Sequence, residues 1–167
     1  MKRKIITLIA KIIVIELVYF VLFFVIFGFS RVKTNAMYPN VNGGDLAFYY
    51  HLDKTCHAGD VVTVKREGER QFLRVIACGG DEVVITSSNS ILVNGSSLDI
   101  DREFSGSLVD IDDNILGDLQ YPYKVPEGYF FLVGDNRYEL SDSRTFGAYP
   151  KNQIDGKVIS LLRTRGI

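Results

Sequence analysis

The sequence predicts a mainly β protein with one N-terminal transmembrane helix, and two observations lead to this fold class. Residues 5–29 are almost entirely apolar, whereas the rest of the chain divides into short runs of strand-forming residues separated by Gly, Asn and Asp. No long amphipathic helical pattern interrupts these runs, which favours antiparallel strands. We therefore expect a cytoplasmic tail and membrane anchor in residues 1–30 and an extracytoplasmic β domain in residues 31–167.

The N-terminal segment has the length and charge pattern of a membrane anchor. A spanning helix needs about 20 mainly apolar residues, and residues 12–29 nearly supply them. Four cationic residues precede the span, and Arg31 and Lys33 follow it. This bias places the N-terminus in the cytoplasm and the following domain outside the cell membrane.

A cleaved signal peptide is the alternative, but its apolar region should be about 7–15 residues long and should end in a site of small residues. Residues 31–36 make a poor site of that kind.

Strand-forming residues dominate the domain that follows. The runs lie at residues 45–50, 60–65, 71–76, 82–86, 90–93, 129–133 and 157–162. Asn94-Gly95 directly follows one run and is a strong signal for a tight hairpin. The charged residues at 65–70 are expected to form a solvated turn.

Residues 86–125 form a less typical, acidic excursion from this pattern. Within it, residues 99–118 hold seven acidic side chains and one basic side chain, which is typical of a solvated loop. A calcium site at Asp110, Asp112 and Asp113 is the alternative, but no loop template with a glycine turn and a terminal Glu matches. We therefore predict no metal and no cofactor.

Composition excludes one class of partner and leaves the two cysteines open. The formal net charge of −1 gives no general basic footprint for nucleic acid. Cys56 and Cys78 have a spacing that fits no common metal template. They are expected to be small, partly buried thiols, and a single disulfide is the alternative, which an extracytoplasmic location would permit.

Three stretches carry the most specific pattern in the chain. Residues 32–39, with Gly44-Asp45 after them, resemble the box V-x-x-x-S-M-x-P and its downstream G-D. Residues 59–81 resemble G-D-V-V … K-R-V-I-G-x-x-G-D, and residues 134–147 resemble G-D-N-R-x-x-S-x-D-S-R-x-F-G. Together these boxes are similar to those of type I signal peptidases, the S26 serine peptidase family. The resemblance covers nearly the whole chain and implies the antiparallel β fold of that family.

The resemblance also implies a chemistry from which this sequence departs. Family members cleave exported precursors with a serine nucleophile, which needs an adjacent base, and a lysine base, which acts only when it is neutral. The serine position is Ala36 and the lysine position is Leu73. Arg74 cannot replace the lysine because a guanidinium group stays protonated. No catalytic residue is therefore expected to be intact.

The resemblance further assigns groove and support residues to the chain. The peptide-groove and box residues are Met37, Pro39, Phe72 and Arg74. The structural support loop comprises Asp135, Asn136, Arg137, Asp142, Ser143 and Arg144.

A frame without its nucleophile and base favours binding of a peptide without cleavage. The chain is similar to the signal-peptidase-like proteins of streptococcal pilus assembly, which lack the serine and lysine and act beside a sortase. This similarity implies a non-catalytic chaperone or adaptor at the Gram-positive cell surface, with pilin subunits and/or a sortase as partners. The alternative is an active type I signal peptidase, seen as a mutant or using an unusual base.

Overall fold

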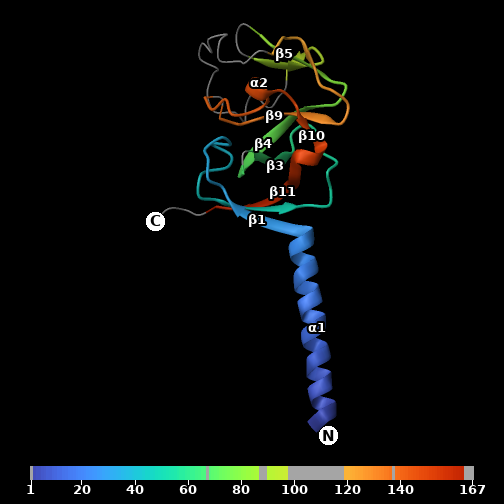
Figure 1. The fold of residues 1–167 in the computed structure, drawn as a ribbon. Coiled ribbons are helices and arrows are strands. Elements are labelled where there is room, and N and C mark those ends of the chain that lie inside the picture. Colours follow the sequence, from blue (N-terminus) through green and yellow to red (C-terminus); the bar gives the residue numbers. More distant parts are fainter. Residues whose placement is uncertain (1, 67, 87–89, 98–118, 137, 164–167) are drawn as a thin grey trace.

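The computed structural model describes residues 2–66, 68–86, 90–97, 119–136 and 138–163. A long helix, α1 (Lys2–Ile26), projects from a β domain, and strand β1 (Phe27–Arg31) continues directly from its end, as Figure 1 shows. None of the residues of α1 is buried, and the helix is long and apolar enough to cross a membrane. The predicted mainly β fold with an N-terminal apolar helix is therefore confirmed.

The helix ends earlier than the apolar pattern suggests. Residues 27–30, which the sequence prediction assigns to the anchor, belong to β1 and pair with β2 (Leu46–Tyr50). Gly28 allows this pairing because a Cβ atom there would lie 2.5 Å from the ring of Tyr49 and 2.8 Å from His51 Nε2. The apolar composition alone cannot distinguish these strand residues from the preceding helix, because both are rich in phenylalanine.

The main sheet has seven strands in the order β1-β2-β11-β3-β4-β9-β10. Its other strands are β3 (Val61–Arg66), β4 (Glu69–Cys78), β9 (Tyr129–Val133), β10 (Tyr149–Pro150) and β11 (Ile154–Leu162). All pairings in it are antiparallel. Among the described strands β1 pairs with β2 alone, so β1 is an edge strand. A four-residue helix, α2 (Ser143–Phe146), and a 3₁₀ turn, η2 (Lys151–Gln153), connect β9, β10 and β11.

A second, four-stranded sheet lies at the end of the domain away from α1 (Figure 1). Its order is β7-β6-β5-β8, with β5 (Glu82–Ile85), β6 (Ile91–Val93), β7 (Ser96–Ser97) and β8 (Tyr123–Lys124). The predicted tight hairpin at Asn94-Gly95 joins β6 to β7, and both turn residues have positive φ, as a type I′ turn requires. The excursion predicted at 86–125 therefore includes part of a sheet. Residues 98–118, with the weighed calcium ligands, lie outside the described residues.

Long runs of buried residues in the central strands β3, β4 and β9 build the core. One apolar cluster lines one face of these strands and contains Leu73, Val62 and Leu132. A second cluster contains Phe72 and Met37 and joins the central strands to the segment after β1. Successive residues of β4 therefore enter different clusters, as the alternation of side chains along a strand requires.

The sheet face next to the helix is aromatic. Phe27 and Phe29 stack against Phe48, and Phe23 and Phe24 of α1 contact the same group. Exposed apolar side chains also come from β2 and β11, namely Leu46, Ile159 and Leu162. Tyr50 contacts Phe27 on the same face, and the amphipathic ring of a tyrosine favours the membrane–water boundary. The face is therefore suited to lie on a bilayer crossed by α1.

Candidate functional site

The residue at the predicted nucleophile position lies in the turn region between β1 and β2. Ala36 is 8% exposed, and its carbonyl oxygen accepts a hydrogen bond of 2.8 Å from the backbone N–H of Asn136. Gly134 packs directly against it, because a Cβ atom on Gly134 would lie 2.5 Å from the Ala36 oxygen. A glycine is thus required where the third box meets the first.

The residue at the predicted base position lies in β4. Leu73 is 1% exposed, pairs with Val62 of β3 and belongs to the apolar cluster of the central strands. Its neighbour Arg74 pairs with Val133, and the next residue of that chain is Gly134, which lies against Ala36. The end of β9 therefore links the segment around Leu73 to Ala36.

Neither of these two side chains can exchange a proton, and the hydroxyl groups of Ser143 and Ser141 are held by other hydrogen bonds. Ser143 is fully buried, and its Oγ accepts a hydrogen bond of 2.8 Å from the Leu132 N–H. Ser141 accepts a hydrogen bond of 3.4 Å from the Gln71 amide. The His51 ring nitrogen Nδ1 lies 2.8 Å from the Asp155 carbonyl oxygen, so it is held at the β11 side of the sheet. The structure thus has an alanine and a buried leucine at the two positions where the resemblance leads one to expect the nucleophile and the base.

The predicted groove residues divide into buried and exposed members. Met37 and Phe72 are each 1% exposed and pack in one cluster with Val32. Pro39 is exposed and follows a cis peptide bond from Tyr38. Met37 and Phe72 are therefore core residues, whereas Pro39 is accessible to solvent.

Arg74 and Asp135 form a buried ion pair between β4 and the loop after β9. The guanidinium donates two hydrogen bonds to the carboxylate, at 2.7 and 2.6 Å, and a third, at 2.9 Å, to the Gly59 carbonyl. Asn40, one residue after Pro39, donates a 2.9 Å bond to the same carboxylate. All three boxes therefore converge on Asp135.

The support loop contains a second buried pair, Asp142 with Arg144. Asp142 accepts bonds from the Arg144 Nε and Nη2 atoms and from the backbone N–H of Gly134. It also caps α2 by accepting from the Arg144 N–H. Because both side chains are at most 1% exposed, this pair fixes Gly134 from inside the domain.

Asn136 ties the loop to the first box from the outside. Besides its backbone bond to Ala36, its side-chain amide donates a bond of 3.2 Å to the Asn35 carbonyl. Arg137 lies outside the described residues. The third box has a serine three residues after its Arg, and the residue at that position in this chain is Leu140, one residue before Ser141. This is a further departure from the family pattern, and it was not among the departures named above.

A cavity of about 200 Å³ lies between the end of β1 and the turn that joins β3 to β4. Its lining residues are Ser30, Arg31, Lys33, Lys65, Gly68, Glu69 and Arg70. The sequence predicts only a solvated turn at residues 65–70. Nothing local in the sequence shows that this turn approaches β1, because the two segments lie more than 30 residues apart.

The two cysteines are free thiols that lie next to each other in the core. The Cys78 thiol donates to the Cys56 carbonyl oxygen at 3.7 Å, and Cys78 packs against the cluster that contains Cys56. Burial raises the pKa of Cys56 from 9.0 to about 11, and it also raises the pKa of Cys78.

We expect native Cys56 to react slowly with iodoacetamide. At pH 8 the raised pKa lowers its reactive thiolate fraction about 100-fold relative to a thiol with the ordinary value. Mass spectrometry of peptides from native and urea-unfolded protein would measure the two rates. Equal rates in both states would contradict the buried position of this thiol.

Comparison with known proteins identifies relatives of one kind. The family described as "Signal peptidase, peptidase S26" matches residues 5–162. Signal peptidase I of Bacillus caldolyticus is 32% identical over 80% of this chain and 79% of its own length. Signal peptidase I S of Bacillus subtilis (strain 168) is 30% identical over 78% of this chain and 74% of its own. A crystal structure of a signal peptidase I from Enterococcus faecalis matches 64% of this chain and 97% of that chain at 25% identity, with a TM-score of 0.47.

Proposed function

This chain belongs to the signal peptidase family, peptidase S26, and we propose that it is a member that binds a peptide segment without cleaving it. The observation that carries the proposal is the pair Ala36 and Leu73, which stand at the nucleophile and base positions of the family boxes. Alanine has no atom that attacks a carbonyl carbon, and leucine accepts no proton. Both catalytic side chains of the family are replaced, while the hydrogen bonds around their positions are kept. This combination favours a protein that still binds a peptide.

The frame around these residues supports binding of an extended peptide. β1 is an edge strand, so its outer backbone groups are available to pair with an added strand. Buried ion pairs at Asp135 and Asp142 hold the loop against Ala36. The cavity beside β1 offers space for side chains of the bound segment. A rigid edge strand next to a cavity is the arrangement that peptide recognition by strand addition uses.

We propose that the bound segment belongs to a pilin subunit, or to a sortase that acts on pilins. The support is the similarity, at both altered positions, to the signal-peptidase-like proteins of streptococcal pilus assembly. In this proposal α1 crosses the cell membrane once, with the N-terminus in the cytoplasm and the β domain outside. The aromatic face of β1 and β2 then rests at the membrane surface, and the edge strand meets subunits that emerge from the membrane.

The second candidate function is cleavage of exported preproteins. It is favoured by the names of the curated relatives, which are signal peptidases, and by the family match along nearly the whole chain. In such a protein another base and another nucleophile would have to act. Among the described hydroxyl groups near Ala36, that of Ser143 is buried as a hydrogen-bond acceptor for β9.

A cleavage and cross-linking experiment separates the two candidates. The full chain in detergent micelles is incubated with a preprotein, beside the Bacillus caldolyticus enzyme as a positive control. We expect no shortened product from this chain, because loss of a nucleophile in a serine peptidase lowers turnover by roughly 10⁶-fold. A shortened product, absent after boiling, would instead establish the second candidate.

Binding is tested on the same preparation with a photoreactive amino acid at Tyr38, which is 50% exposed at the rim of the site. The matched control carries the same group at Lys124, which is exposed on β8. We expect a pilin subunit to cross-link at position 38 and not at position 124. Equal labelling at both positions would contradict a specific groove.

A further inference from the structure

The cavity between the end of β1 and the β3–β4 turn is lined mainly by charged side chains. Four of its lining residues are cations and one is an anion. The cations are Arg31, Lys33, Lys65 and Arg70, and the anion is Glu69. Cations on both sides of a small cavity raise the local concentration of anionic groups.

On the side of the cavity formed by the β3–β4 turn, one further carboxylate neutralises part of the positive charge. Asp155 of β11 accepts a bond from Arg70 at 2.5 Å and lies 3.8 Å from the Lys65 ammonium. The described residues at the cavity thus include four cations against two carboxylates, Glu69 and Asp155. On the β1 side, Arg31 and Lys33 are exposed, and within the described parts of the chain neither forms an ion pair. The excess positive charge therefore lies beside the edge strand.

The cavity lies close to Ala36 along the chain. Lys33 precedes Ala36 by three residues, so the two are separated by at most about 11 Å of extended backbone. A peptide that pairs with the β1 edge and reaches Ala36 would place one side chain near Lys33, about three residues from the peptide residue that lies at Ala36. The cations of the cavity would then favour a negative charge on that side chain.

We propose that the segment this protein binds is acidic, with Glu or Asp side chains held by the cationic cavity at Lys33 and Lys65. This inference rests on the proposed function and names the chemical class of its partner. It goes beyond the altered catalytic positions, which carry no information about charge.

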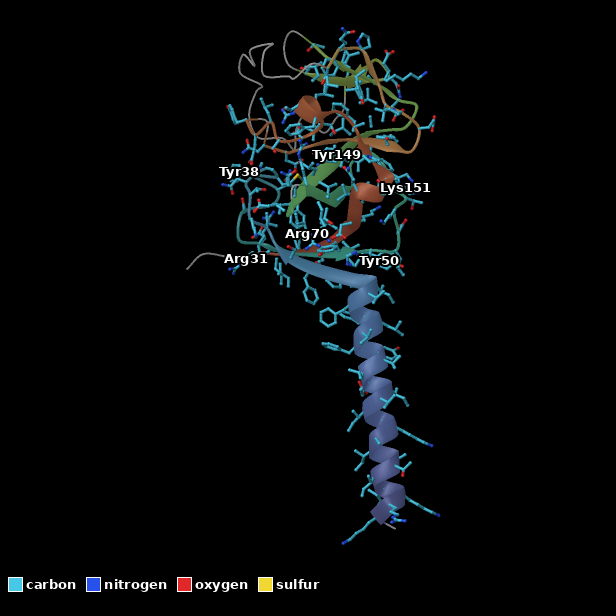
Figure 2. All side chains as sticks on the ribbon, viewed as in Figure 1. Arg31, Tyr38, Tyr50, Arg70, Tyr149 and Lys151 are labelled. Atoms are coloured by element: carbon cyan, nitrogen blue, oxygen red, sulfur yellow. The ribbon has the colours of Figure 1, made fainter. Side chains whose placement is uncertain are left out.

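A peptide fits the cavity better than a lipid headgroup. Ser30 lines the cavity and lies on the face of β1 opposite Phe27 and Phe29, the residues that pack toward the helix, whereas the same alternation places Arg31 on their face. Figure 2 shows Arg70 on the side of β1 away from α1. The part of the cavity next to Ser30 and Arg70 therefore opens to the domain side of β1, whereas a headgroup would approach from the helix side.

Two labelled peptides test the proposal on the full chain in nanodiscs of phosphatidylcholine. Both are fluorescein-labelled dodecapeptides of Val, Thr and Ser, one with two Glu residues and one with Gln at the same positions. We expect the Glu peptide to bind about tenfold more tightly, because two partly exposed ion pairs contribute roughly two- to fivefold each. The preference should shrink in 0.5 M salt, where screening is strong.

A charge swap provides the decisive variant. Lys33→Glu should abolish the preference for the Glu peptide and favour a third peptide with Lys at those positions. Lys124→Glu, the same change on β8, should leave the preference intact, and Lys65→Glu repeats the swap if the first variant does not fold.

The other outcomes overturn the inference in distinguishable ways. Equal binding of the Glu and Gln peptides would overturn the charge selection and leave the proposed function standing. Failure of every peptide to bind would overturn both. Displacement of the Glu peptide by dihexanoyl phosphatidylglycerol, at lower concentration than by unlabelled peptide, would assign the cations to lipid headgroups instead.

Discussion

Replacement of Asp142 by alanine is expected to lower the free energy of unfolding of the β domain by about 3–5 kcal/mol, the usual cost of removing one partner from a buried ion pair. Asp142 is 1% exposed and Arg144 is fully buried, so the variant removes a buried carboxylate that accepts hydrogen bonds from the Arg144 Nε and Nη2 atoms. The variant also leaves the Gly134 N–H without its acceptor and α2 without its cap. These losses fall on one side chain, so the effect should be among the largest of any single substitution.

Thermal and urea unfolding of the full chain in detergent, followed by near-ultraviolet circular dichroism of its tyrosines, would measure this change. Glu82→Ala is the matched control, because Glu82 is an exposed carboxylate on β5. Arg144→Lys on its own should also lower the free energy of unfolding, because an ammonium group cannot reproduce the paired Nε and Nη2 contacts with Asp142. A loss in Asp142→Ala no larger than that in Glu82→Ala would contradict the structural role of the pair.

The sequence predicted most of the fold because its strands are continuous runs of β-branched and aromatic residues bounded by turn signals. The tight hairpin at Asn94-Gly95 has the turn chemistry that specifies it. The boundary between α1 and β1 could not be placed from composition, since an apolar run has the same appearance in a spanning helix and in a strand. It is the close approach of Tyr49 to Gly28, a tertiary contact, that defines the strand.

The candidate site was predictable only where a box fixes the residue by its spacing. Ala36, Leu73 and the two Asp residues of the third box are found in this way. The cationic cavity is not, because Lys33 and Arg70 come from segments that the folded sheet brings together. The pairing of Arg70 with Asp155 of β11 likewise depends on strand order, which no local pattern encodes.

The second large effect is expected from Leu73→Lys, which places an amine in an apolar cluster. Leu73 is 1% exposed among residues such as Val62 and Leu132. Full burial lowers the pKa of a lysine by up to about 3–5 units, which corresponds to roughly 4–5 kcal/mol of stability at pH 7, because only the part of the shift above pH 7 counts at that pH. Between that lowered pKa and about 10.4 the unfolded chain binds more protons than the folded chain. The stability of the variant should therefore rise with pH through this window and approach the native value above it.

The same variant combined with Ala36→Ser tests what the frame retains. A neutral amine next to a hydroxyl group is the pair that the family chemistry needs, and Gly134 links the two positions. Each single variant should leave preprotein cleavage at the background of the native chain, because a nucleophile without a base, or a base without a nucleophile, does not act. The double variant should cleave at least about 100-fold faster than either, although Leu140 still departs from the third box. Cleavage by Ala36→Ser alone would show that another group serves as base and that Leu73 does not explain the absence of activity. A double variant that folds but does not cleave would show that more than these two side chains separates this chain from an active peptidase.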